Sequence, residues 1–134
     1  MIRTDEARPS DSPLNLDFRL TSTPLPGAAT GGNRSTISQH GNDNSAVALI
    51  SGGANTTMQR QEGNQNDSTI RVNDGYDNTV KVEQNGNNHR SDINLSNTVG
   101  QEVVHIQHGS GESASISHSG TATQEPIIVK QGLH

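Results

Sequence analysis

Histidine and acidic side chains are the residues of this chain whose types and spacing suggest chemistry. Six histidines are present, and His105 and His108 form the closest pair. Two rings three positions apart converge on one ion when they lie on a helix. The segment around this pair alternates like a strand, in which positions three apart face opposite sides. We therefore expect scattered, solvated imidazoles and no metal site.

Acidic residues near predicted turns would offer a second chemistry, calcium binding. They are Asp43, Asp67, Asp74, Asp77 and Asp92. Repeat proteins that bind calcium in their loops carry a Gly-Gly-x-Gly-x-Asp nonapeptide, which is absent here. Two interpretations stay open: the charges restrain premature aggregation, or they are simply solvated carboxylates.

Catalysis needs a nucleophile or base held by an orienting group, and the sequence shows no recognisable arrangement of this kind. Asn-x-Ser/Thr sequences are expected by chance in a chain this rich in Asn and Ser. They begin at Asn33, Asn55, Asn66 and Asn94. The sequence therefore predicts no enzyme, no catalytic residue and no cofactor.

The composition restricts the kind of fold that can position any site. Of 134 residues only 27% are hydrophobic and 1% aromatic, well under the roughly 45–50% apolar share of ordinary domains. A conventional core of this composition is hard to build, because ordering costs about 1–2 kcal/mol per residue. The chain is therefore either disordered or ordered by a repeated architecture in which backbone hydrogen bonds dominate.

Charge and segment patterns exclude several partners. The formal net charge is -5, so no basic face is expected for phosphates and no nucleic-acid partner is predicted. No apolar run approaches the roughly 18 residues of a membrane helix, so membrane insertion is not expected. There is no cysteine for a disulfide. Residues 1–10 lack the apolar core of a signal peptide, so a secreted protein of this sequence would be the mature form.

The composition changes at about residue 32. Residues 1–32 hold four of the five prolines and are predicted to form an N-terminal segment that is flexible or loosely docked. Leu14, Leu16, Phe18 and Leu20 alternate within it. This alternation leaves open a short strand against the first repeat or a proline-bounded tail. Residues 33–134 are predicted to form a separate repeat domain.

The repeat is marked by a glutamine followed two residues later by a glycine. Copies begin at Gln39, Gln61, Gln84 and Gln107, with a shortened copy at Gln131. Further turn signals lie midway between the copies, so each repeat of 22–24 residues contains two strand-length units. The repeats are about 33–54, 55–77, 78–100 and 101–124, with a half repeat at 125–134.

Within each unit, alternate residues are apolar or carry an amide, a period of two that is typical of strands. The sequence therefore predicts an all-β fold, a β-solenoid of about 4.5 strand-turn-strand repeats with rungs about 4.8 Å apart. The predicted inward set begins with Asn33, Ser35, Ile37 and Gln39 and continues at the equivalent positions of the other units.

The facing of single units stays open, because a one-residue slip turns every side chain of a strand over. Four apolar residues have the parity opposite to the predicted inward set. They are Val47, Leu49, Met58 and Val104.

Stacked rungs would bring equivalent positions into columns. The predicted Gln ladder is Gln39, Gln61, Gln84, Gln107 and Gln131. The predicted Asn ladder is Asn33, Asn44, Asn55, Asn66 and Asn78, of which Asn33, Asn55 and Asn78 begin one column. Turn glycines with positive φ are predicted at Gly41, Gly52, Gly63, Gly75, Gly86, Gly109 and Gly120. The predicted apolar column is Ile37, Ala48, Ile70, Val82, Ile93, Ile116 and Val129. Stacked amides can bond along a column while the backbone pairs from rung to rung.

The pattern Gln-x-Gly-x-x-Asn-x-Ala, complete at Gln39, Gly41, Asn44 and Ala46, resembles the repeat of bacterial curlins, the subunits of curli fibres. Weaker copies follow in the next three repeats. The resemblance covers roughly residues 33–134, and the number of repeats is similar to that of curlins.

The sequence departs from the curlin pattern in two ways. Curlin repeats usually open with Ser, and the corresponding residues here are Asn33, Asn55, Asn78, Gln101 and Glu125. Curlins usually carry a second Gln column, and the residues at those positions here are Ile50, Val72, Leu95 and His118. We expect an apolar column to replace the second amide ladder.

The resemblance implies a structural subunit of extracellular amyloid fibres that supports biofilm matrix, adhesion and aggregation of cells. It implies a homopolymer in which solenoids stack head-to-tail into cross-β fibres on the bacterial cell surface. The partners implied in the same way are a nucleator subunit, an outer-membrane secretion pore and periplasmic chaperones.

The main alternative function is a monomeric β-solenoid binding module or adhesin. Ice binding would need a regular outward threonine array, which the spacing of the threonines does not provide. An adhesin would carry atypical capping repeats, and none is recognisable. A chain without a fold of its own is disfavoured by the strict register, although the soluble monomer can be disordered before assembly.

Overall fold

The computed structural model describes residues 17–23, 32–120 and 125–132. Every helix or strand within these ranges is a β-strand, so they contain no helix that could cross a membrane. The strands are β1 (Asp17–Thr23), β2 (Arg34–His40), β3 (Ser45–Gly53), β4 (Thr56–Asn64), β5 (Asp67–Tyr76), β6 (Thr79–Asn87), β7 (Arg90–Ser96), β8 (Glu102–Ser110), β9 (Ser113–Ser119) and β10 (Ile127–Gln131). The prediction of an all-β fold is confirmed.

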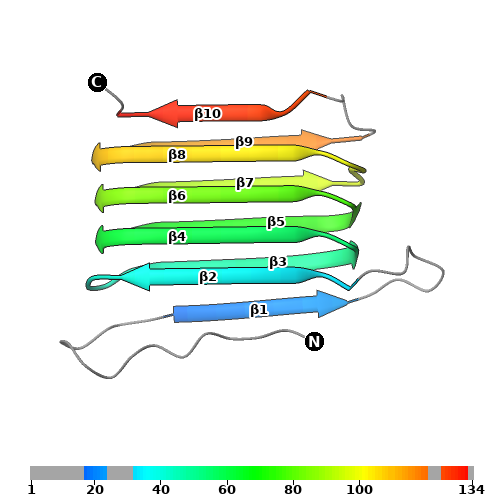
Figure 1. Cartoon of the computed structure of the whole chain (residues 1–134), viewed down its shortest axis with the longest axis horizontal. Helices are drawn as coiled ribbons and strands as arrows, with labels where there is room; N and C mark the ends of the chain where they lie inside the picture. The colour runs from blue at the N-terminus through cyan, green and yellow to red at the C-terminus, as the bar shows by residue number, and fades with distance from the viewer. Residues whose placement is uncertain (1–16, 24–31, 121–124, 133–134) are drawn as a thin grey trace.

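The strands form two parallel five-stranded sheets, which we call the odd sheet and the even sheet. The odd sheet has the order β1-β3-β5-β7-β9, and the even sheet has the order β10-β8-β6-β4-β2. The chain alternates between them from β2 onward, so each pair of strands makes one rung and successive rungs stack (Figure 1). The predicted β-solenoid is therefore confirmed.

The register between rungs is nearly constant. Ile70, Ile93 and Ile116 pair directly in successive strands of the odd sheet. One irregularity lies between Ile50 and Gly52, where β5 has one residue more than β3. This extra residue explains why the first repeat is one residue shorter than the second.

The alternation of the sequence sets which side chains face inward. In β3 the alternate residues Ala46, Ala48 and Ile50 are buried, and the residues between them are not. Met58, which has the opposite parity in β4, is 45% exposed. The predicted inward set faces inward in β2 to β10, and no strand among them is turned over.

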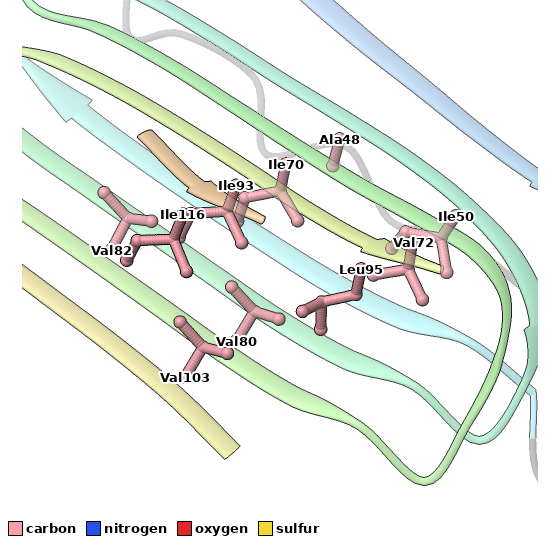
Figure 2. Packing of buried hydrophobic residues seen from close by; sticks show 10 residues of the cluster. All are labelled: Ala48, Ile50, Ile70, Val72, Val80, Val82, Ile93, Leu95, Val103 and Ile116. Carbon is pink, nitrogen blue, oxygen red and sulfur yellow. The ribbon is translucent and has the colours of Figure 1, made fainter. Parts of the chain in front are cut away.

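A narrow hydrophobic core lies between the two sheets (Figure 2). Its buried members are Ala48, Ile50, Ile70, Val72, Val80, Val82, Ile93, Leu95, Val103 and Ile116. These side chains are too few to fill the whole interior. Buried amides, hydroxyls and two histidines occupy the remaining inward positions.

The N-terminal segment contributes one strand to the odd sheet. β1 pairs in parallel with β3, with Phe18 opposite Ala46 and Leu20 opposite Ala48. Of the two interpretations of this segment, a strand against the first repeat therefore applies to residues 17–23. Leu14 and Leu16 lie outside the described residues, as do residues 24–31 and 133–134.

Candidate functional site: the side-chain ladders and the open ends

The predicted Gln ladder lies in one column of the even sheet. Nε2 of Gln61 donates to Oε1 of Gln84 at 2.8 Å, and Nε2 of Gln84 donates to Oε1 of Gln107 at 2.9 Å. Gln39 donates in the same way to Gln61, and Gln107 donates to Gln131 at 2.9 Å. The structure therefore brings all five predicted glutamines together, and the first four each donate to the next one toward the C-terminal end.

Each inner glutamine also bonds across the solenoid to the odd sheet. Nε2 of Gln61 donates to the Ser45 carbonyl at 2.7 Å, and Nε2 of Gln84 donates to the Asp67 carbonyl at 3.0 Å. Gln107 repeats this contact with the Arg90 carbonyl at 3.0 Å. One amide nitrogen thus joins neighbouring rungs and also joins the two sheets.

The direction of the Gln ladder leaves different groups at its two ends. Oε1 of Gln39 is buried and has no hydrogen-bond partner among the residues that the structure describes. Nε2 of Gln131 donates to the Ser113 carbonyl at 3.1 Å, and no further glutamine of the described chain lies beyond it to receive its second N–H. The N-terminal end therefore presents an acceptor and the C-terminal end presents a donor.

The five asparagines of the predicted Asn ladder belong to two columns at opposite edges of the solenoid, and Asn33, Asn55 and Asn78 form one of them. Asn33, Asn55 and Asn78 precede strands of the even sheet, and Asn44 and Asn66 precede strands of the odd sheet. Two units per rung place alternate units on opposite sheets, which separates the two sets.

Both asparagine columns bond along the stack and also to the turns. Oδ1 of Asn55 accepts from the backbone N–H and from Nδ2 of Asn78, at 3.1 and 3.0 Å. Nδ2 of Asn55 donates to the Gly75 carbonyl at 2.7 Å. In the other column, Oδ1 of Asn66 accepts from the backbone N–H of His89 at 3.1 Å. These amides form hydrogen bonds with backbone groups of the turns that are not paired in the two sheets.

The residues of the predicted apolar column lie in two columns, one in each sheet. Ala48, Ile70, Ile93 and Ile116 form a continuous column in the odd sheet. Ile37, Val82 and Val129 lie in the even sheet, where Gln59 and His105 interrupt them. The expected replacement of the second amide ladder is confirmed for Ile50, Val72 and Leu95, which pair in one buried column.

The turn glycines have two different reasons for being glycine. Gly41, Gly63 and Gly86 have positive φ and stack closely: a Cβ on Gly63 would lie 1.9 Å from the Gly86 carbonyl oxygen. Gly52, Gly109 and Gly120 also have positive φ. The prediction of positive φ is wrong for Gly75. There a Cβ would meet Nδ2 of Asn78 at 2.4 Å, so close approach excludes a side chain.

The expectation of solvated imidazoles is wrong for His89 and His105, which are buried. His105 lies between Val82 and Val129 in its column. Its Nε2 lies 3.2 Å from Oε1 of Gln131, and its Nδ1 lies 2.7 Å from Oγ of Ser91. Because Oε1 can only accept, Nε2 carries the proton and Nδ1 accepts from the serine.

Burial lowers the pKa of His105, because removal from water disfavours the charged ring. The hydrogen bond to Gln131 acts in the opposite direction, and the neighbouring His89 lowers the pKa further. The register of the sequence already places His105 among the inward positions. The position of His105 in the repeat therefore indicates burial, whereas the imidazole type alone indicates exposure to water.

The acidic residues near the turns have backbone and surface roles. Asp43, Asp74 and Asp77 adopt positive φ in turns, a conformation that Asp tolerates better than most residues. Asp92 pairs with Arg71 at 3.1 Å on the exposed outer face, and Asp67 lies 3.9 Å from Arg90. Within the described ranges, no three metal-binding side chains gather at one place.

Both ends of the even sheet are open edges. Among the described strands, β2 and β10 each pair with one strand only. Their inward side chains, such as Ile37 and Val129, are half-buried, whereas the equivalent Val82 of an inner rung is fully buried. The even sheet can therefore hydrogen-bond to one more strand at each end and bury its inward side chains.

In comparisons with known proteins, no family model, no curated protein and no solved structure matches this chain.

Proposed function

We propose that this protein is the structural subunit of a fibre that grows by head-to-tail stacking of β-solenoids. The observation that carries the proposal is that the internal columns run to both ends and are incompletely buried there. Gln61, Gln84 and Gln107 are fully buried, whereas Gln39 and Gln131 at the ends are half-buried. A second molecule stacked on either end would bury these side chains as the inner rungs are buried.

The backbone at the two ends supports the same proposal. The free edges of β2 and β10 carry N–H and C=O groups that no further strand pairs. Natural proteins usually blunt such edges, because an open edge is a template for another chain. A contact between two different ends is heterologous and does not close, so it produces a fibre and not a dimer.

The direction of the Gln ladder favours head-to-tail contact over head-to-head contact. In a head-to-tail stack, Nε2 of Gln131 would donate to Oε1 of Gln39 in the next molecule. This contact repeats the internal bonds of the ladder. Two copies joined by like ends would instead oppose two acceptors or two donors.

We further propose that the fibre is an extracellular amyloid of the curlin type. Support comes from the resemblance: its Gln and Gly positions are the ladder and the close-packed turn column described above. The role would then be in biofilm matrix and in adhesion and aggregation of cells. A nucleator subunit, an outer-membrane pore and periplasmic chaperones would be the partners.

The proposal is tested by thioflavin T fluorescence on freshly desalted protein, with fibre diffraction of the product. We expect a lag, sigmoidal growth that seeds shorten, and a meridional reflection at about 4.7–4.8 Å. A protein that stays monomeric and β-rich, with a cooperative melt, would contradict the fibre and indicate the binding module or adhesin.

A matched pair of variants examines the C-terminal end specifically. Val129→Asp places a carboxylate in the half-buried column of β10, and Ile128→Asp places it on the exposed outer face of the same strand. Seeded growth should slow by about tenfold or more in the first variant, because the charge would be desolvated at the contact. Equal slowing in both variants would contradict growth through this end.

A further inference from the structure

The two sheets are offset by one strand at both ends of the solenoid. At the N-terminal end the odd sheet begins with β1, one level below β2 of the even sheet. At the C-terminal end the even sheet finishes with β10, one level above β9 of the odd sheet. Figure 1 shows β1 below the first complete rung and β10 above the last one. The two half-rungs lie on opposite sheets.

Head-to-tail stacking through the even sheet alone would leave a gap in the odd sheet. If β10 pairs with β2 of the next molecule, β9 and the next β3 are two levels apart. The vacant level has the width of one strand, about 4.8 Å. In the next molecule β1 already occupies that level, because it is paired with β3.

We infer that β10 of one molecule and β1 of the next form one shared rung, in which β1 pairs on its free edge with β9 of the preceding molecule. This inference rests on the proposed fibre and specifies its interface. Residues 17–23 are then part of the fibre and not an appendage to the repeat domain. Each molecule completes the rung that its neighbour leaves half-built.

The register of the shared rung follows from the internal pairing. β1 pairs with β3 as β9 pairs with β7, so the columns can be extended by one level. The extension places Phe18 of one molecule opposite Ala114 of the other and Leu20 opposite Ile116. In the odd sheet Phe18 also pairs with Ala46. The register position of the one phenylalanine of the chain would thus lie between two alanine positions.

The charge pattern of the odd sheet matches this placement. β5 and β7 carry charged residues on their outer faces, for example Arg71 and Asp92. β3 and β9, the two strands that would flank β1, contain no Asp, Glu, Lys or Arg. The register positions opposite Asp17 and Arg19 are therefore uncharged in both flanking strands. Like charges at directly opposite positions would destabilise the pairing.

An unpaired group on β9 lies at the same contact. Nε2 of His118 is buried and has no hydrogen-bond partner. Within one molecule, His118 continues the column that begins with Ser22 opposite Ile50. In the shared rung the next Ser22 would lie at the register position opposite His118.

Cysteine pairs test the shared rung, since the natural chain has no cysteine to interfere. In Ser117→Cys/Thr21→Cys the two positions are directly opposite across the inferred contact, about 5 Å apart, which suits a disulfide. Within one molecule the same positions lie at opposite ends of the odd sheet and cannot meet. Oxidised fibres dissolved in formic acid should give a ladder of covalent oligomers on a non-reducing gel.

A matched pair controls for random contact. Ser117→Cys/Asp17→Cys uses the same two strands, but its positions are displaced by four residues, about 13 Å along the strand. We expect about tenfold less cross-linking in this pair, because a disulfide needs Cα atoms within about 7 Å. Equal cross-linking in both pairs would overturn the inferred register.

A third pair separates failure of this inference from failure of the proposed fibre. In Lys130→Cys/Ser38→Cys the positions are exposed and opposite each other where β10 meets the next β2. Cross-linking of this pair without cross-linking of Ser117→Cys/Thr21→Cys would refute the shared rung and leave the fibre in place. No cross-linking of either pair in fibres would refute head-to-tail stacking itself.

Discussion

In this solenoid, buried amide side chains connect the strands and the two sheets, a role that aliphatic side chains have in ordinary domains. Each inner glutamine bonds along its column and also across to the opposite sheet. A buried hydrogen bond contributes only about 0.5–1.5 kcal/mol net, but an abandoned partner costs about 1–3 kcal/mol. The ladder therefore acts more by penalising wrong registers than by its total strength.

The first prediction concerns the middle of the Gln ladder. Gln84→Leu leaves Nε2 of Gln61, Oε1 of Gln107 and the Asp67 carbonyl without this partner. We expect a loss of roughly 2–5 kcal/mol in the free energy of unfolding, measured by guanidinium denaturation. Glu83→Gln on the outer face of the same strand should change it by less than about 0.5 kcal/mol. A leucine variant as stable as that control would contradict the ladder's role.

The second prediction concerns His105. Its folded pKa is lowered by burial, so the unfolded chain binds the proton more readily. The stability that the neutral ring contributes is complete above the unfolded value of about 6.5 and is lost as the pH falls through the folded value. Unfolding measured across this range should therefore show stability that decreases with acidification.

The pH dependence is assigned to His105 by two substitutions in its column. His105→Val removes the titrating ring and introduces the residue found at 82 and 129, so the slope of stability against pH should flatten. Gln59→Val removes a buried amide of the same column without removing a titrating group, so the slope should persist. An unchanged slope in the histidine variant would show that other groups cause the dependence.

At the scale of the strands, the close stacking of the turns and the open edges of the even sheet are the features that can be tested. The turns between β-strands stack as closely as the strands do, which is why glycine recurs where backbones approach. The edges β2 and β10 lack an obvious block, except that Pro126 immediately precedes β10. The packing of the turns is therefore tested by replacing a turn glycine with alanine. The edge of β10 is tested by replacing Pro126 with a residue that has a backbone N–H.

The third prediction compares two turn glycines with similar backbone. Gly63 (φ 115) and Gly109 (φ 105) both have positive φ, but of these two only Gly63 has a carbonyl of the next rung, among the described residues, in the way of a Cβ. Gly63→Ala should therefore be less stable than Gly109→Ala by roughly 2 kcal/mol or more in guanidinium denaturation. Equal losses would mean that φ alone selects glycine in this column.

The fourth prediction concerns Pro126. At the equivalent position of earlier rungs, the N–H of Thr56 donates to the Asn78 carbonyl and the N–H of Thr79 donates to the Gln101 carbonyl, both toward the C-terminal end. Proline has no N–H to offer there. Pro126→Ala should lower the critical concentration for fibre growth roughly 2- to 10-fold, the effect of one net backbone hydrogen bond.

The control for this prediction is Ile128→Val, which keeps every backbone donor of β10. Critical concentrations are measured by sedimentation at the end of seeded growth. If Pro126→Ala grows no better than the control, the edge of β10 is not where a new molecule adds.

At the scale of the whole molecule, some features of the fold follow from the sequence and others do not. A period of two and a recurring Gln-x-Gly unit predicted the solenoid and the facing of its strands, because parallel stacking repeats each position in one column. The asparagines divide between two columns because alternate units lie on opposite sheets. Strand β1 lies outside the repeats, so no second copy of its alternating segment fixes its register.

The two histidines show a different limit of the sequence. His89 continues the column of Asn44 and Asn66, and His105 lies between two valines. Both positions follow from the repeat, but the burial of a histidine there depends on local partners such as Ser91. Residue type alone therefore gave the wrong environment.

Mass per length of the thinnest fibres is the most direct test of head-to-tail stacking. Each molecule of 14.2 kDa contributes five strands to a sheet, so it should lengthen a filament by about 24 Å, five spacings of about 4.8 Å. Scanning transmission electron microscopy should then give about 6 kDa per nm. A value of about 30 kDa per nm, one chain for every strand spacing, would mean that the chains lie flat in register and would contradict the solenoid fibre.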